Sequence, residues 1–270
     1  MLHNATGIVD PFRRSSNKHT HSAPLVSSMQ AATLLAHLCV VDAERRRRAA
    51  NPALNEKVGA LKIYQQRRFA LTYADLLASD RYGAATRYFL AELYGPIDFT
   101  SRDAQFAAVA PTVAQLFPEE FAATVATLSE LHALSETLDS AMGLELESAS
   151  ITRAGYIRAW QQVGRPQDRE RQVALTLAIA DRLDRFTRQP LFRTGLHLMR
   201  GPALAAGLSD LQQLLEEGFD TFRAMQGADQ FIEWVGARER ALAAALFTAD
   251  PKKAGSVRGT DRALAWLPEA

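Results

Sequence analysis

The sequence has very little cysteine, since only Cys39 occurs in 270 residues. A disulfide within one chain needs two thiols, and zinc or iron–sulfur centres built on cysteine need several. This scarcity is typical of proteins kept in a reducing compartment, which indicates a cytoplasmic location. Cys39 lies in the apolar run from Leu34 to Val41, so we expect its thiol to be buried.

Long apolar runs and an excess of charge of one sign are missing as well. No stretch approaches the roughly 20 apolar residues that a membrane-spanning helix needs. Residues 1–24 combine charged side chains and prolines without an apolar stretch, which indicates a disordered arm and not a secretory signal peptide. The 31 Lys and Arg residues are balanced by 30 Asp and Glu, which gives a net charge of +1. We therefore predict neither a nucleic acid nor a membrane among the partners.

The motifs of common catalytic and cofactor sites are not found. The chain has no glycine-rich phosphate loop, no His-Glu-x-x-His and no Gly-x-Ser-x-Gly. Ferritin-like di-iron proteins repeat Glu-x-x-His, but none of the helical histidines His37, His132 and His197 follows a glutamate at this spacing. The sequence therefore excludes the usual di-iron site and offers no recognisable catalytic constellation or metal site.

Alanine and leucine dominate the sequence, and alternating runs of Val, Ile and Thr are missing, which predicts an all-α fold. Prolines and glycines mark the expected helix ends, among them Gly143 and Gly201-Pro202. We expect about ten helices in one orthogonal or bundle-like domain over residues 25–249, followed by a flexible tail over residues 250–270, in which a contact of Leu264 to Leu267 with the body is the alternative. The predicted helices span residues 27–50, 52–80, 82–94, 101–111, 118–142, 151–163, 166–188, 190–200, 208–225 and 228–247.

Four arginines, Arg45 to Arg48, close the first predicted helix. Consecutive helical residues are turned by about 100° from one another, so these four side chains cannot share one face. Cations are favoured at a helix C-terminus, which predicts a solvated helix end. The alternative is a docking patch for an acidic partner.

Two histidines are candidate functional residues. His132 and Glu136 are four residues apart and share a helix face, so Glu136 could orient His132 as a haem ligand or a general base. His197 lies among apolar residues and could face a haem in a globin-like arrangement. A boundary ion pair at His132 and a satisfied core histidine at His197 are the structural alternatives, and we favour them.

Tyrosines gather in the first half of the chain, where five of the six precede residue 100. Buried tyrosine hydroxyls need hydrogen-bond partners, and charged residues occur at helical spacing in the same segment. Such a region can bind an anionic or aromatic ligand, or it can be a structural hydrogen-bond network, which we favour. The candidate ligand-binding residues are Tyr73, Arg87, Tyr88, Asp98 and Arg102.

Residues 87–99 read Arg-Tyr-Phe-Leu-Ala-Glu-Leu-Tyr-Gly-Pro-Ile-Asp-Phe and are followed by Arg102-Asp103. This segment resembles a motif of a family of uncharacterised all-helical bacterial proteins, and residues 199–203 and 207–212 are similar to that family too. The resemblance covers about residues 55–247 and leaves out the arm and the tail. It implies a helical fold and a bacterial origin but no mechanism, because no activity is established for the family.

Three classes of function remain open. The first hypothesis is a non-enzymatic interaction or regulatory protein with a protein partner or a second copy of itself, because no catalytic constellation is found. The second is a small-molecule sensor or carrier with a pocket between helices, of which a haem site at His132 or His197 is one version. The third is a cofactor-free enzyme that uses paired charges such as Asp98 and Arg102.

Overall fold

The computed structural model describes residues 23–92, 119–205, 207–256 and 262–269 of the chain. Within these ranges it contains ten α-helices, two short 3₁₀ helices and no strand, which confirms the predicted all-α class. The elements are α1 (Ala23–Ala49), α2 (Pro52–Thr72), α3 (Ala74–Leu77), α4 (Gly83–Glu92), α6 (Glu119–Glu145), α7 (Arg153–Val163), α8 (Pro166–Thr187), α9 (Pro190–Ala205), α10 (Ser209–Ala224), α11 (Asp229–Thr248), η1 (Pro251–Ser256) and η2 (Leu264–Trp266). The helix predicted over residues 101–111 lies outside the described residues.

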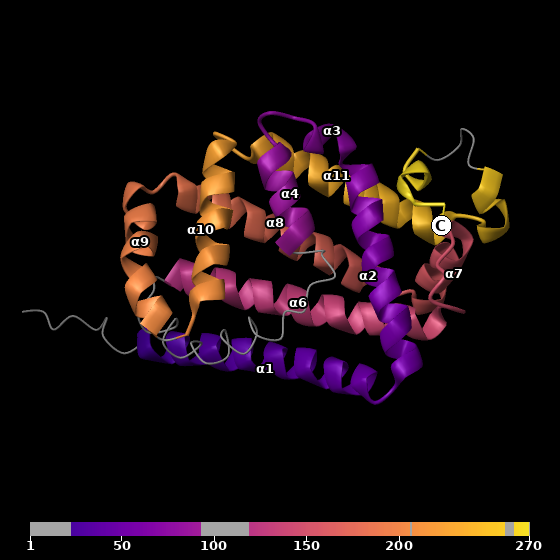
Figure 1. The fold of residues 1–270 in the computed structure, drawn as a ribbon, viewed down its shortest axis with the longest axis horizontal. Helices are drawn as coiled ribbons and strands as arrows, with labels where there is room; N and C mark the ends of the chain where they lie inside the picture. Colours follow the sequence, from indigo (N-terminus) through magenta and orange to yellow (C-terminus); the bar gives the residue numbers. More distant parts are fainter. Residues whose placement is uncertain (1–22, 93–118, 206, 257–261, 270) are drawn as a thin grey trace, which may run out of the picture.

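The helices form one domain in which two sets cross each other. Figure 1 shows α1, α6, α8 and α11 stacked one above another, with α2, α4 and α10 running across them. The contacts agree, because α6 packs on α1 and α8, α8 packs on α11, and α10 packs on α8. α9 lies beside α10 at one edge, and α7 lies at the opposite end. Of the two expected packings, orthogonal and bundle-like, this arrangement corresponds to the orthogonal one.

Local sequence explains several helix ends. The side chain of Asn51 accepts a hydrogen bond from the amide of Leu54 at 3.1 Å, and Pro52 occupies the first turn of α2. At α7 the hydroxyl of Thr152 accepts a bond from the amide of Gly155, also at 3.1 Å. Gly164 ends this helix with a φ of 63°, which glycine adopts without steric cost.

One predicted helix end is wrong because the glycine that suggests it has a packing role. The sequence predicts an end at Gly143, whereas α6 continues through this residue to Glu145. A β-carbon on Gly143 would lie 2.6 Å from Cγ2 of Val58, a residue of α2. Gly143 therefore allows the close approach of α6 and α2.

A second predicted end is wrong at α9, which includes Pro202 and ends at Ala205. Proline lacks the amide that would bond the carbonyl four residues earlier, which belongs to Leu198. Leu198 is an exposed residue, so water can bond its carbonyl instead. The loss of this one backbone hydrogen bond therefore costs α9 little stability, and the helix continues for one more turn.

The hydrophobic core includes the described part of the predicted tail. Leu264 and Leu267 are buried in the same cluster as Leu61, Tyr156 and Leu246. The hydroxyl of Tyr64 donates a hydrogen bond to the carbonyl of Pro268 at 2.9 Å. Residues 262–269 are thus part of the packed body, beyond the domain boundary expected at residue 249.

Cys39 is exposed, which corrects the expectation of a buried thiol. Among the residues of α1 whose burial the structure describes (32–49), the buried ones are Leu34, Val41 and Arg48, which follow one another at intervals of seven. This spacing forms a narrow stripe that faces α6, and five residues beyond Leu34 the helix has turned well away from it. An apolar run in sequence is therefore only half buried in this helix.

Arg48 also departs from the expected solvated helix end, because it is buried against α6. Its guanidinium donates to the hydroxyl of Ser140 at 2.9 Å and forms an ion pair with Glu136. Lys62 binds the other carboxylate oxygen of Glu136 at 2.6 Å. Although burial alone would raise the pKa of Glu136, Lys62 and Arg48 together hold this pKa at about 2.

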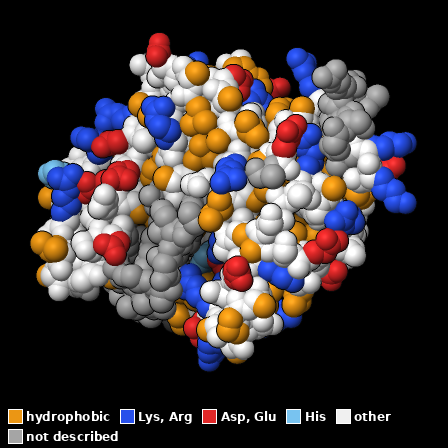
Figure 2. Space-filling model, turned by 45° about the vertical axis from the view of Figure 1, so that its right-hand side comes forward, with side chains coloured by type: hydrophobic (Ala, Val, Ile, Leu, Met, Phe, Trp, Pro, Cys, Tyr) orange, Lys and Arg blue, Asp and Glu red, His pale blue; other side chains and the backbone are white. Residues whose placement is uncertain are grey.

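The exposed surface carries charges of both signs. Figure 2 shows one face on which hydrophobic side chains gather near the centre, with Lys, Arg, Asp and Glu side chains around them. Ion pairs such as Arg240 with Glu170 and Arg193 with Asp220 account for part of this mixture. In the part of the chain that the structure describes, no helix combines the length and the apolar character that crossing a membrane would require.

Candidate functional site

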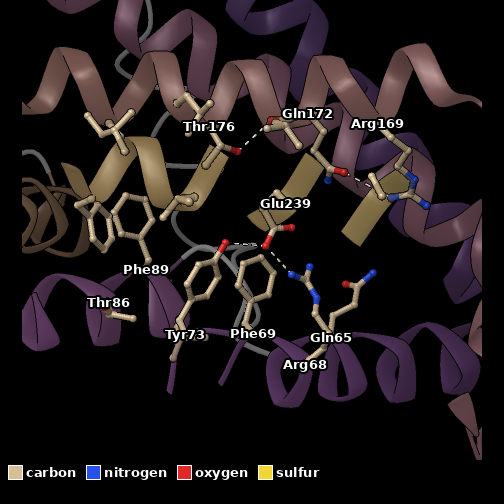
Figure 3. A pocket seen from close by; sticks show the side chains of 18 of the residues that line it. Gln65, Arg68, Phe69, Tyr73, Thr86, Phe89, Arg169, Gln172, Thr176 and Glu239 are labelled. Carbon is tan, nitrogen blue, oxygen red and sulfur yellow. Dashed lines mark hydrogen bonds and ion pairs between the residues drawn. The ribbon is translucent and has the colours of Figure 1, made fainter. Parts of the chain in front are cut away.

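Five helices surround a cavity of about 80 Å³, which Figure 3 shows from close by. α2, α4, α7, α8 and α11 each contribute side chains mostly three or four residues apart, because this spacing places them on one helix face. The lining residues are Gln65, Arg68, Phe69, Tyr73, Thr86, Phe89, Leu90, Tyr156, Trp160, Arg169, Gln172, Val173, Thr176, Leu177, Ala180, Phe231, Ile232, Val235, Glu239 and Ala243.

The cavity is apolar at one end and polar at the other. In Figure 3, Phe89 and Thr86 lie at one end, whereas Arg169, Gln172, Arg68 and Gln65 lie toward the other. The rings of Phe89 and Phe231 are 5.8 Å apart, as in other packed aromatic pairs. The hydroxyl of Thr86 donates to the carbonyl of Tyr82, just before α4, so it adds little polarity to the apolar end.

An ion pair crosses the middle of the cavity wall from α2 to α11. Arg68 and the hydroxyl of Tyr73 both donate to Oε1 of Glu239, each at 2.6 Å (Figure 3). Burial disfavours the charged form of Arg68, but the Glu239 carboxylate outweighs this effect and raises the pKa of Arg68. Glu239 therefore already balances one of the two arginines that line the cavity.

Arg169 is the second arginine of the lining, and it has no carboxylate partner among the described residues. It is only 4% exposed, and its guanidinium carbon lies 3.9 Å from the ring centre of Trp160. One nitrogen contacts Gln172 at 3.4 Å, which is long for a hydrogen bond. Burial lowers the pKa of Arg169, although a guanidinium remains charged near neutral pH.

Several donors of the lining are left without an acceptor. Within the described part of the chain, no hydrogen-bond partner is found for Nε and Nη2 of Arg169, Nε1 of Trp160 and Nε of Arg68. All four atoms are buried N–H donors. Among the described residues of the lining, no buried side-chain oxygen lacks a hydrogen-bond partner. The polar end of the cavity thus has an excess of donors.

A neighbouring charge cluster interacts electrostatically with Arg169 through Asp139 but supplies no hydrogen-bond acceptor to its Nε and Nη2. Asp139 accepts a bond from Gln65 at 3.1 Å, and burial raises the pKa of this carboxyl group. Asp139 lies beside the Lys62, Glu136 and Arg48 group, in which two cations meet one carboxylate. With Asp139 included, this cluster holds two cations and two carboxyl groups. The cavity lining holds two arginines and one carboxylate, which leaves one positive charge.

The structure places the predicted ligand-binding residues in different parts of the molecule. Tyr73 lines the cavity. Arg87 and Tyr88 do not, because Arg87 donates to the carbonyl of Leu77 at 3.2 Å and Tyr88 donates to the carbonyl of Leu214 at 2.9 Å. Both line a wider surface hollow of about 700 Å³ against α9 and α10. Asp98 and Arg102 lie outside the described residues.

The two candidate haem ligands do not line the cavity and lie on different helices. His132 is half-buried on α6, where it contributes to the low pKa of Glu136. His197 is exposed on α9, so the expectation of a core histidine is wrong. The described residues contain no group of three or more His, Cys, Asp or Glu side chains arranged to hold a metal ion.

Sequence reasoning missed Arg169, Trp160 and Glu239. A signal for Arg169 was present, because it precedes Val173, Leu177 and Ala180 by four, eight and eleven residues on the amphipathic helix α8. This spacing puts Arg169 on the apolar face, whereas charge alone suggests the opposite face. No comparable signal could join Glu239 to a cavity that begins at residue 65.

Comparisons with known proteins place the chain in a family but assign it no activity. No curated protein and no solved structure matches the chain. A family model described as a domain of unknown function (DUF8198) matches residues 44–253. This range contains all the residues that line the cavity, and it agrees with the resemblance to an uncharacterised family. The chain therefore belongs to the DUF8198 domain family.

Proposed function

We propose that the protein binds a small molecule in the cavity between α2, α4, α7, α8 and α11 and acts as a sensor or carrier. The observation that carries the proposal is the buried guanidinium of Arg169, whose Nε and Nη2 have no acceptor among the described residues. An unpaired buried donor costs about 1–3 kcal/mol, and more when the group is charged. A ligand that supplies acceptors removes this cost on binding.

The walls support the same proposal. Aromatic and aliphatic side chains with a few convergent polar groups are typical of small-molecule sites. Arg68, Glu239 and Tyr73 hold one another by hydrogen bonds of 2.6 Å, so the polar wall is already in place without a ligand. A site that is formed in advance loses less entropy on binding.

A separate observation favours the interaction hypothesis as a second candidate. Leu191, Leu198 and Leu204 of α9 are 82%, 71% and 70% exposed. Exposed leucines concentrated on one edge helix are typical of a contact with another protein, including a second copy of the chain. This surface lies on α9, which takes no part in the cavity.

Native mass spectrometry of the full chain purified from its own host tests the proposal. We expect a reproducible excess mass from a retained small molecule, which is lost in Ala243→Leu because the larger side chain fills the cavity. Ala237→Leu is the matched control, since Ala237 is exposed on the same helix and outside the lining.

An apo mass for the wild-type chain, or an excess mass that persists in Ala243→Leu, would contradict binding in this cavity. An apo mass at an integer multiple of the chain mass would instead support the second candidate as a homo-oligomer. Urea denaturation of both variants checks that each one folds.

A further inference from the structure

The charge and the hydrogen-bond donors at the polar end of the cavity determine which kind of ligand it can bind. The identity of this ligand rests on the proposed function, because it concerns the same cavity. The relevant atoms are the four unpaired N–H groups of Arg68, Trp160 and Arg169. A neutral apolar molecule would leave all of them without acceptors.

The donors belong to side chains that cannot reach bulk water. Arg169 and Trp160 are 4% and 8% exposed, and the guanidinium of Arg169 lies over the indole ring of Trp160. Stacking partly stabilises a buried cation, but it uses the face of the guanidinium and leaves its in-plane N–H groups free. A planar carboxylate matches these groups in shape and in charge.

The charge of the lining limits the ligand to a single negative charge. Arg68 is neutralised by Glu239, and Arg169 contributes the remaining positive charge. The adjacent group of Arg48, Lys62, Glu136 and Asp139 lies outside the lining, and Asp139 is the carboxyl group of that cluster that interacts electrostatically with Arg169. A phosphate monoester carries about −1.5 to −2 near neutral pH and would leave buried negative charge unbalanced.

The opposite end of the cavity determines the rest of the molecule. Phe89, Phe231, Leu177 and Ala180 form an apolar lining beyond the polar groups. The hydroxyls of Thr86 and Thr176 donate to the backbone carbonyls four residues earlier and offer no further donors. A volume of about 80 Å³ limits the ligand to a short apolar chain.

We infer that the ligand of this cavity is a small monocarboxylate with a short apolar chain, whose carboxylate is bound by Arg169 and by the indole N–H of Trp160. The apolar chain then lies along Phe89 and Phe231 toward α4. Arg68 and Glu239 hold the wall between the two ends and do not need to bind the carboxylate directly.

Isothermal titration calorimetry of the full chain with hexanoate and with hexanamide tests the inference, because the two probes differ mainly in the charge of their polar group. We expect hexanoate to bind at least about tenfold more tightly than hexanamide. Arg169→Gln should weaken hexanoate binding at least about thirtyfold and abolish the preference over hexanamide, as expected when one partner of a buried charge pair is removed. Arg171→Gln is the matched control, since Arg171 is exposed on the same helix and pairs with Glu130.

Trp160→Phe provides a second variant in case Arg169→Gln does not fold, because it keeps an aromatic ring and removes only the indole donor. We expect this variant to reduce the preference for hexanoate and to keep hexanamide affinity. Equal affinity of the wild-type chain for both probes, or unchanged hexanoate binding in Arg169→Gln, would overturn the inference.

Failure of the inference can be told apart from failure of the proposed function. Equal binding of both probes that is lost in Ala243→Leu would overturn the carboxylate and retain the cavity as a binding site. No hexanoate binding by the wild-type chain would also overturn the inference. The proposed function would then be decided by the mass of the protein purified from its host.

Discussion

At the scale of single residues, two buried arginines show how differently the same side chain can be used. Arg48 is bound by Glu136 and Ser140, and Glu136 is bound again by Lys62. Arg169 is as deeply buried but has only Trp160 beside it and Gln172 at a long distance. Arg48 therefore belongs to a complete structural ion pair, whereas Arg169 is a buried cation without a carboxylate that forms a hydrogen bond with it.

The structural pair gives a prediction for Glu136. Glu136→Gln should lower the free energy of unfolding by about 3 kcal/mol, because it leaves Arg48 and Lys62 buried without a counter-charge. The control is Glu130→Gln on the same helix, whose more exposed pair with Arg171 is worth at most about 1 kcal/mol. Urea denaturation at neutral pH measures both variants, and equal losses would contradict the assigned role.

The low pKa of Glu136 also fixes the direction of a pH effect. Its pKa is about 2 in the folded chain, below the ordinary glutamate value of about 4.3, so the folded state is stabilised above the ordinary value. This contribution is lost as the pH falls from about 4 toward 2. We therefore expect acid to destabilise the wild-type chain more than Glu136→Gln.

Sequence alone could not separate these two arginines. Arg48 belongs to a run of four arginines that suggests a solvated helix end, and Arg169 stands in a stretch of alternating charges. Whether an arginine is buried depends on which face of its helix packs against neighbouring helices. Whether it is paired depends on residues far away in the sequence, such as Glu136, which lies 88 positions after Arg48. Of the five candidate ligand-binding residues, Tyr73 lines the cavity, where it lies between α2 and α3 and its buried hydroxyl donates to Glu239.

At the scale of helices, the sequence was a good guide to where elements occur and a weaker guide to where they end. Caps such as Asn51 and Thr152 act locally, so they can be read directly from the chain. Gly143 and Pro202 have the same residue types as helix ends but lie inside helices. Their roles depend on a neighbouring helix or on solvent, and neither is visible in a local window.

Two glycines inside helices should therefore respond in opposite ways to the same substitution. Gly59→Ala in α2 should raise the free energy of unfolding by about 0.5–1 kcal/mol, because nothing lies within 4 Å of the added β-carbon. Gly143→Ala in α6 should lower it by about 1–3 kcal/mol, because the β-carbon would meet Val58. Chemical denaturation of the pair decides the matter, and a stabilised Gly143→Ala would refute the close approach of α6 and α2.

At the scale of the whole molecule, the core joins segments from both ends of the described chain. Leu61 and Tyr64 of α2 share a cluster with Leu264 and Leu267 near the C-terminus. Composition and helix patterns predict one helical domain, and the structure confirms it. They do not show that the last described residues complete the core, because pairing over such separations leaves no local signal.

The C-terminal residues should accordingly contribute strongly to stability. Leu267 is 1% exposed, so Leu267→Ala should lower the free energy of unfolding by about 2–5 kcal/mol. Leu198→Ala is the control, since the same substitution at an exposed leucine should change stability by less than about 0.5 kcal/mol. Thermal and urea denaturation provide the measurement, and a small effect at Leu267 would mean that the tail is not part of the core in solution.

The long separations within the core also determine when this protein can complete its fold during synthesis. The Arg68–Glu239 pair joins residues 171 positions apart, and Tyr64 bonds a carbonyl 204 positions later. Contacts of this kind pay a large loop-closure entropy and form late in folding. While the chain emerges from the ribosome, the part of α2 that packs on Leu264 and Leu267 therefore stays uncovered until residue 267 has been made, which gives chaperones a long interval in which to bind it.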